Sequence, residues 1–170
     1  NIRAYRFLCQ SYNILMDYDN LYKSANKMME LIVNTSSTLN SKYDDNYYYC
    51  LMSLGNASYK VGLNVHTKYY LTAYQHSKLL FDNCEPLYEL ASINHQQGNL
   101  EMAYRYIKRC IEIPMPENIF ATQINNKIYE TYRWSLLLSL SEKLGYNDDY
   151  KLACKNMYGR DDLIPLNSLM

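Results

Sequence analysis

The sequence predicts an all-α fold in which about four helix hairpins stack as an α-solenoid. Apolar residues recur at three- and four-residue steps along almost all of the 170-residue chain, which is the period of an α-helix. Strand-like alternation does not persist, and the chain holds only five Gly and four Pro, the residues that interrupt helices. The same helix–turn–helix pattern returns along the chain, so we expect neighbouring hairpins to bury each other's apolar faces.

The stretch EPLYELASINHQQGNLEMAYRYIKRCIEIPMP contains the clearest hairpin. Pro86 suits the first turn of a helix, where its missing N–H costs nothing, and Glu85 suits the positive end of the helix dipole. Gly98 favours the left-handed backbone in which many helices end. The closing IPMP cannot continue the second helix, because proline removes backbone hydrogen bonds.

Large and small side chains alternate within this hairpin in a specific order. Leu87, Leu90 and Ala91 supply large, large and small positions on the first helix, and Ala103 and Ile107 supply small and bulky positions on the second. Two helices can approach closely only where one side chain is small. The order matches the tetratricopeptide pattern, so we expect the solenoid to be right-handed and tetratricopeptide-like.

Other segments repeat this plan. The expected hairpins lie at about residues 4–33, 47–80, 86–113 and 132–158. Ala25, Ala73 and Ala153 occupy the small positions of the other second helices. Turns are expected at 17–20, at 62–64 and at Gly145.

Two connections are longer than a hairpin turn. Residues 34–45 are rich in Ser, Thr and Asn, and residues 114–130 form an insertion, while 159–170 form a C-terminal tail. We interpret residues 1–170 as a single helical repeat domain. Because the chain runs from Asn1 straight into a helical pattern, we also expect it to be a fragment of a longer protein.

Charge and cysteine usage exclude several classes of protein. The 17 Lys and Arg balance the 17 Asp and Glu, whereas a nucleic-acid-binding protein normally carries a basic excess. No apolar run approaches the roughly 20 residues of a membrane span, and no signal peptide opens the chain. The five cysteines form no CxxC pair, which indicates reduced, buried thiols in a cytoplasmic protein rather than disulfides or a zinc site.

The sequence indicates no catalytic, cofactor or metal site. Asp17-Tyr18-Asp19 has the spacing of a metal-binding DxD motif, but no apolar strand precedes it, so we interpret it as a capping turn. We interpret the three histidines, His66, His76 and His95, as surface or groove residues. We interpret Arg105, Lys108 and Arg109 as a solvated basic face, with contact to an acidic partner as the alternative.

The 20 tyrosines include the candidates for partner binding. Most fall at core spacings, where an aromatic ring fills volume and its hydroxyl reaches the surface. In a solenoid of this kind, the first helix of each hairpin lines the concave face. The candidate concave-face residues are Tyr48, Tyr59, Tyr88, Ser92, His95 and Gln96. Aromatic and polar groups side by side suit either a peptide or a sugar ring, and the sequence does not separate the two.

Two long stretches resemble a known module. EPLYELASINHQQGNLEMAYRYIKRCIEIPMPENIF resembles the helical repeats downstream of the catalytic domain in some family-two-like glycosyltransferases, in its EPLYELA opening, its Gly turn and its closing IPMP. IYETYRWSLLLSLSEKLGYNDDYKLAC is similar to the next element, with Tyr132-Arg133-Trp134 and Leu144-Gly145-Tyr146 at the matching places. The resemblance covers about residues 3–158. Ser135-Leu136-Leu137 departs from it, because more polar residues are usual there.

This resemblance implies a non-catalytic accessory domain without a cofactor of its own. It would position a glycosyltransferase catalytic domain of the same polypeptide on an acceptor or partner, or mediate self-association. The alternative is a protein-interaction module that binds a peptide and has no connection with sugar transfer. A carbohydrate is a further candidate ligand for the tyrosine-lined face.

The repeat register makes a stability prediction. Replacing Ala103 or Ala153 by Leu is expected to overpack a helix crossing and to lower the free energy of unfolding by roughly 1–3 kcal/mol. Thermal melts measure the effect. Melting temperatures unchanged within error would show that the register is wrong.

Overall fold

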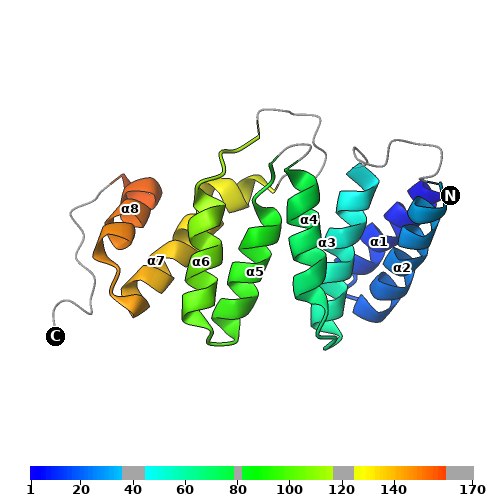
Figure 1. Cartoon of the computed structure of the whole chain (residues 1–170), viewed down its shortest axis with the longest axis horizontal. Coiled ribbons are helices and arrows are strands. Elements are labelled where there is room, and N and C mark those ends of the chain that lie inside the picture. Colours follow the sequence, from blue (N-terminus) through cyan, green and yellow to red (C-terminus); the bar gives the residue numbers. More distant parts are fainter. Residues whose placement is uncertain (36–44, 79–81, 117–124, 160–170) are drawn as a thin grey trace. The chain divides into compact units, whose positions relative to one another are not determined.

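The computed structural model describes residues 1–35, 45–78, 82–116 and 125–159 (Figure 1). All regular secondary structure in these ranges is helical, which confirms the all-α prediction for the described residues. The chain divides into two compact units, Asn1–Asp82 and Asn83–Met170. No helix of the described residues is long and apolar enough to cross a bilayer.

The first unit contains four helices. They are α1 (Ile2–Ile14), α2 (Tyr18–Thr35), α3 (Asp45–Lys60) and α4 (His66–Ser77). Each packs against the next in chain order, and α1 also contacts α3. The main buried cluster consists of Cys9, Leu21, Ala25, Met28, Ile32, Cys50, Leu54 and Ala57. Its members recur at the helical period, so each helix turns one apolar face inward.

The helices α3 and α4 approach each other closely at Gly55. A Cβ atom placed on Gly55 would lie 2.8 Å from Cε1 of Tyr70. The Tyr70 ring is itself buried, with 2% of its surface exposed. Gly55 therefore makes the room in which this large side chain sits.

The second unit also pairs its helices. It contains α5 (Glu85–Gln96), α6 (Leu100–Ile111), α7 (Arg133–Leu144) and α8 (Asn147–Tyr158), with a π-helical turn η2 (Ile128–Tyr132) directly before α7. Consecutive helices pack together, η2 packs on α7, and α5 also contacts α7. In Figure 1, α5 and α6 lie side by side as an antiparallel hairpin.

The alanines expected at small positions are all inside the two units. Ala25, Ala73, Ala103 and Ala153 are 0% exposed. Each lies on the second helix of a pair, where any larger side chain would push against the neighbouring helix. Ala4 of α1 is exposed, so Ala4→Leu is the matched control for the two alanine substitutions above.

Four hairpin turns share one backbone geometry. The φ angles of the residues that end the first helices are 57° at Met16, 79° at Gly62, 79° at Gly98 and 76° at Gly145. In each turn, the next N–H donates to a carbonyl five residues back, over 2.9, 2.8, 2.8 and 2.9 Å in chain order. This is the Schellman hydrogen bond that closes a helix with a left-handed residue. Met16 fills a place for which glycine is the unstrained choice.

The structure departs from the expected turn at 17–20. The helix α2 already begins at Tyr18, and Asp17 is the residue that caps it. The Asp17 Oδ1 accepts from the Asn20 backbone N at 3.2 Å, and Oδ2 accepts from Asn20 Nδ2 at 2.7 Å. The acidic run is thus a helix start, because carboxylates satisfy free N–H groups there. The interpretation of Asp17 as a cap is confirmed.

The expected insertion is partly helical. Residues 125–130 lie at the start of the helical segment that continues through η2 into α7, and Ile128 and Tyr129 are each 3% exposed. The remainder, 117–124, lies outside the described residues, as do 36–44 and the tail from 160 onward.

The contact between α3 and α4 predicts that Gly55→Ala destabilises the protein, whereas helix propensity alone would predict stabilisation. Gly→Ala in a helix normally stabilises by up to about 1 kcal/mol. Gly55→Ala is expected instead to lower the free energy of unfolding by roughly 1–3 kcal/mol, because the new methyl group meets the buried Tyr70 ring. Urea unfolding measures this difference.

A double-mutant cycle separates the clash from other causes. In a Tyr70→Leu background, Gly55→Ala should lose most of its cost, because the ring is gone. An equal cost in both backgrounds would contradict the proposed contact.

Candidate functional site

The six candidate residues fall into two groups on the two units. Tyr48 and Tyr59 lie on α3 of the first unit, whereas Tyr88, Ser92, His95 and Gln96 lie on α5 of the second. Each group is described within its own unit.

The two tyrosines of α3 are largely occupied with contacts inside the first unit. Tyr48 is 3% exposed and lies in a buried cluster with Leu51 and Ala73. Tyr59 is half-buried and meets His66 edge-on, with 5.2 Å between ring centroids. Tyr48 therefore offers a partner very little surface.

The α5 residues form one face together with Tyr132 of η2 and Lys143 of α7. Tyr88, Ser92, His95 and Gln96 are spaced at i, i+4, i+7 and i+8, so they share one side of the helix. Tyr88 stacks on Tyr132, with 6.3 Å between ring centroids and 27° between ring planes. Tyr132 remains 40% exposed. Two near-parallel aromatic rings therefore open to solvent at one end of this face.

The other end of the same face carries a charged group. Lys143 of α7 donates from Nζ to Nε2 of His95 at 2.9 Å. Burial, with a further contribution from the Lys143 charge, lowers the pKa of His95. A neutral imidazole is what this contact requires, because only an unprotonated ring nitrogen can accept from an ammonium group. We call the surface formed by Tyr88, Ser92, His95, Gln96, Tyr132 and Lys143 the α5–α7 face.

Tyr88 acts as a neutral group on this face. Burial, together with the neighbouring Glu89 and Tyr132, raises the pKa of Tyr88 to about 12. Its hydroxyl therefore stays protonated at neutral pH and can both donate and accept. The face combines stacked rings, neutral hydroxyl groups and one exposed ammonium, which suits peptide backbone or sugar hydroxyl groups better than a highly charged ligand.

A buried polar cluster lies at the start of α5. Glu85, in the first turn of α5, is 4% exposed. Its carboxylate accepts from the Tyr129 hydroxyl at 3.0 Å and from the Asn125 backbone N at 3.1 Å. The same Tyr129 hydroxyl accepts from the Cys84 backbone N at 3.0 Å. Tyr129 thereby joins the start of α5 to the turn before α7.

Arg133 joins this turn to the end of α6. It is 8% exposed, and one guanidinium nitrogen donates to the carbonyl oxygens of Cys110 at 3.3 Å and Ile113 at 2.6 Å. Its Nε donates to the carbonyl of Tyr129 at 3.1 Å. The last carbonyls of a helix lack partners within the helix and carry partial negative charge, so a buried guanidinium suits them. We call Glu85, Tyr129 and Arg133 the polar clamp.

The π-helical geometry of η2 fits the clamp. The backbone N–H of Arg133 bonds to the Ile128 carbonyl, five residues back, while the Arg133 side chain donates to Tyr129. The guanidinium also lies over the rings of Tyr129 and Trp134, at 5.1 and 5.2 Å. Sequence reasoning missed this role, although Arg133, Leu137 and Leu140 share the buried side of α7. An arginine on an otherwise apolar helix face was the sequence signal that could have predicted a buried guanidinium.

The structure also tests the interpretations of the histidines and of the basic residues on α6. His66 and His76 are each 8% exposed, so the expectation that they are surface or groove residues is wrong. They pack edge-on against Tyr59 and Tyr47, which bury their rings. Of the basic residues on α6, Lys108 pairs with Asp149 at 2.6 Å, while Arg105 is exposed.

The cysteines are free and buried, as expected from the sequence: Cys9, Cys50, Cys84, Cys110 and Cys154. Among the residues that the structure describes, no group of three or more His, Cys, Asp or Glu side chains could hold a metal ion.

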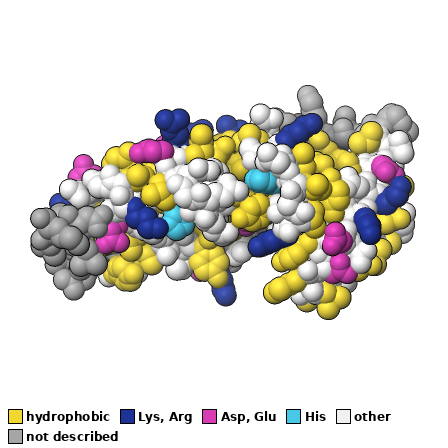
Figure 2. Space-filling view, turned by 90° about the horizontal axis from the view of Figure 1, so that it is seen from below, with side chains coloured by type: hydrophobic (Ala, Val, Ile, Leu, Met, Phe, Trp, Pro, Cys, Tyr) yellow, Lys and Arg dark blue, Asp and Glu magenta, His cyan; other side chains and the backbone are white. Residues whose placement is uncertain are grey.

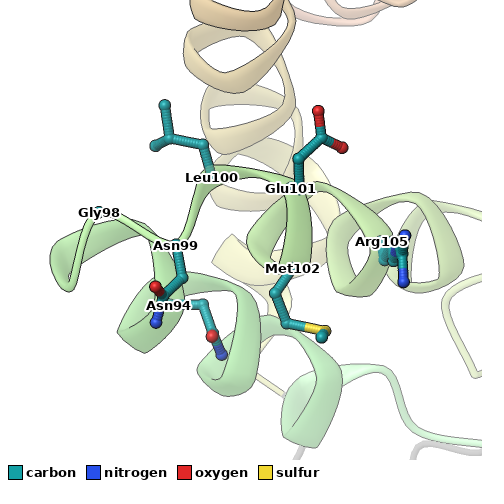
Figure 3. A pocket seen from close by; sticks show the side chains of 7 residues that line it. All are labelled: Asn94, Gly98, Asn99, Leu100, Glu101, Met102 and Arg105. Carbon is teal, nitrogen blue, oxygen red and sulfur yellow. The ribbon is translucent and has the colours of Figure 1, made fainter.

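A shallow pocket of about 560 Å³ lies at the turn between α5 and α6. Figure 3 shows its lining residues: Asn94, Gly98, Asn99, Leu100, Glu101, Met102 and Arg105. No member of the α5–α7 face belongs to this lining, although Asn94 is next to His95 in the sequence. Its rim carries one acidic and one basic side chain, and the Tyr146 hydroxyl donates to Glu101 at 3.1 Å.

An exposed apolar strip runs along α1 of the first unit. Phe7 is 66% exposed and Ile14 is 79% exposed, and Leu8 and Leu15 beside them are 42% and 73% exposed. Contiguous apolar surface of this kind often marks a protein–protein contact. On the face shown in Figure 2, basic and acidic side chains are interspersed rather than gathered by sign.

No protein-family model matches the chain, and a comparison with curated proteins finds no significant match. The relation to tetratricopeptide repeats and to glycosyltransferases therefore stays a prediction from the sequence.

The clamp predicts how stability depends on pH. Burial raises the pKa of Glu85 above its ordinary value of 4.5, despite the hydrogen bonds that act in the other direction. A raised folded-state pKa means that the folded protein holds this proton more tightly than the unfolded chain. The contribution of Glu85 is therefore full below pH 4.5 and is lost as pH rises through the folded-state pKa.

Glu85→Gln tests this sign. The amide keeps a carbonyl oxygen that can accept from Tyr129 but cannot ionise. The free energy of unfolding is measured for the wild type and for Glu85→Gln at each pH. The advantage of the wild type over Glu85→Gln should be larger at acid pH than at neutral pH. Urea unfolding at both pH values measures it, and Glu101→Gln at an exposed site is the control. A difference that favours the wild type more at neutral pH would contradict the assignment.

Proposed function

We propose that this chain is a non-catalytic helical-repeat scaffold that binds a protein partner through the α5–α7 face. In this proposal, about four tetratricopeptide-like hairpins stack as a right-handed α-solenoid. The support is the recurrence of one Schellman turn at Met16, Gly62, Gly98 and Gly145 and of a fully buried alanine in each second helix. Repeats of this kind expose the first helices of successive hairpins to partners.

One observation carries the binding surface. Tyr132 is 40% exposed and stacks on Tyr88, while Lys143 and His95 meet on the same two helices. Rigid aromatic side chains contribute much of the energy at protein interfaces, since they bury large area at a small entropy cost. The polar clamp holds α5, α6 and the start of α7 together one helical turn from the Tyr88–Tyr132 pair, so the rings are already in position.

We propose that the partner is the catalytic domain of a family-two-like glycosyltransferase in the same polypeptide. This step rests on the resemblance of residues 3–158. The reading frame upstream of Asn1 tests it directly. A strand-rich domain with a DxD motif at a strand end would support the proposal, and an unrelated upstream sequence would reject it.

The second candidate is a peptide-binding module unconnected with sugar transfer. The open end of the Tyr88–Tyr132 pair favours it, because a single apolar peptide side chain fits beside two stacked rings. A displayed library of random peptides is the probe. Peptides enriched on the wild-type chain would support this candidate.

Self-association has its own structural support in the apolar strip of α1. Sedimentation of the wild-type chain and of Phe7→Ser measures it. A concentration-dependent dimer that Phe7→Ser dissociates would place the contact on α1. A dimer unchanged by this substitution would exclude the strip.

The α5–α7 face makes a prediction about affinity. Replacing both Tyr88 and Tyr132 by Ala should weaken binding of the catalytic domain or of an enriched peptide by roughly tenfold or more. Tyr158→Ala is the matched control, because Tyr158 is 57% exposed and lies on α8. Equal loss in both variants would contradict the assigned face.

Carbohydrate binding is tested on the same surface. Trp134 follows Tyr132 in the chain, so its fluorescence should change when a sugar ring stacks on the tyrosine pair. Titration with oligosaccharides should then show saturation that Tyr88→Ala abolishes. An unchanged signal at millimolar sugar would exclude this ligand class.

A further inference from the structure

The helix α1 is apolar on two sides. Its inner side places Cys9 in the core of the first unit, with Ile2, Tyr5 and Tyr12 packed against that core. Its outer side carries the exposed apolar strip, and none of the described residues of the first unit covers it. A helix of a folded protein normally buries one apolar side and exposes a polar one, so the outer side has the character of a contact surface.

Four residues of the outer side have the spacing of a helix-pairing surface. Ala4, Phe7, Ser11 and Ile14 follow one another at steps of three, four and three residues. This is the spacing at which two helices pack side by side along their length. We call these four residues the α1 seam. The exposed residues that directly follow Phe7 and Ile14 are also apolar, so they widen the seam along one edge.

Large and small side chains alternate along the α1 seam. Phe7 and Ile14 are large, with 66% and 79% of their surface exposed, and Ala4 and Ser11 are the small residues between and before them. The Ser11 hydroxyl already donates to the Phe7 carbonyl at 3.0 Å. The seam can therefore be buried without leaving this donor unsatisfied.

We propose that α1 pairs with α1 of a second copy of this chain, antiparallel, about a two-fold axis at the level of Cys9. Phe7 of each copy then packs against Ser11 of the other, and Ala4 packs against Ile14. Every large side chain thus meets a small one, and the same surface serves both copies. The inference deepens the self-association proposed for the apolar strip, and it does not require the α5–α7 face to bind anything.

A parallel pair of the same helices fits less well. It would place Phe7 against Phe7 and Ala4 against Ala4, so that the helices would be pushed apart at one layer and leave a gap at the next. It would also bring the two Arg3 side chains together at one end, where like charges repel. Size and charge therefore select the antiparallel direction.

The charges at the ends of α1 are complementary in that direction. Arg6 is already paired with Asp45 at 3.1 Å inside the unit, whereas Arg3 is exposed and enters no ion pair with the described residues. Antiparallel pairing brings Arg3 to the far end of the second copy's α1, where Asp17 and the exposed Asp19 lie at the start of α2. Two symmetric contacts of this kind add little affinity but fix the direction.

Sedimentation of the full 170-residue chain tests the pairing. Over about 1 to 100 µM the wild type should pass from monomer to dimer, because a single pair of short helices lies at the small end of interface sizes. A chain that stays monomeric over this range would overturn the proposal.

Ser11→Leu tests the direction. Ser11 is exposed in the single chain, so the substitution should leave the fold intact, which circular dichroism checks. In the antiparallel pair the leucine meets Phe7 of the second copy, and association should weaken roughly tenfold. In a parallel pair, or on a patch without fixed geometry, one more apolar side chain would strengthen association. Association that is unchanged or stronger would overturn the antiparallel seam.

Exchanging the large and the small residue should restore the pair. Phe7→Ala alone should weaken association roughly tenfold, and Phe7→Ala combined with Ser11→Leu should return it to within about threefold of the wild type. Met102→Ser is the control, because Met102 is 43% exposed on α6 of the second unit and should leave association unchanged. A double variant weaker than both single variants would contradict the packing of Phe7 on Ser11.

Two further variants separate this inference from its neighbours. Ala4→Leu should weaken association as Ser11→Leu does, while its melting temperature at a monomeric concentration stays that of the wild type. Tyr88→Ala with Tyr132→Ala, which removes the rings of the α5–α7 face, should leave sedimentation unchanged. Loss of the dimer in this last variant would overturn the assignment to α1, and loss of peptide binding alone would leave it intact.

Discussion

The burial of Arg133 is the constraint on which the second unit depends. A guanidinium keeps its charge at any pH that the protein meets, so it can be buried only among acceptors. Here the acceptors are the carbonyls of Cys110, Ile113 and Tyr129, at 3.3, 2.6 and 3.1 Å. One side chain thus ends α6 and fixes the turn before α7. Were it removed, these buried carbonyls would lose their donor, which is costly in a water-free interior.

The clamp also connects the structural and the proposed functional parts of this unit. Tyr129 links Arg133 to Glu85 and thus to the start of α5, the helix that also bears Tyr88 and His95. The Tyr88 and Tyr132 rings lie on elements that the clamp orients. Changes in the charge or hydrogen bonding of this small cluster would therefore reach the α5–α7 face.

Several features of the fold could be predicted from the sequence because they depend on residues close together in the chain. Helical periodicity, the glycines at 62, 98 and 145 and the small alanines each act over one or two turns, and the structure places them as expected. The α5 stripe of Tyr88, Ser92, His95 and Gln96 follows from spacing alone. Its completion by Tyr132 and Lys143 does not, because those residues reach it only through packing of α7 beside α5.

The sequence by itself determined that the chain is helical, which helix faces are apolar and which residues are small enough for close packing. Tertiary structure decided which polar side chains are buried and which groups they bond to. Tyr48 and His66 are buried, and Arg133 donates to carbonyl groups 20 and 23 residues away in the chain. The physical reason is that backbone periodicity is a short-range property, whereas a buried polar group is defined by partners that only the folded chain brings to it.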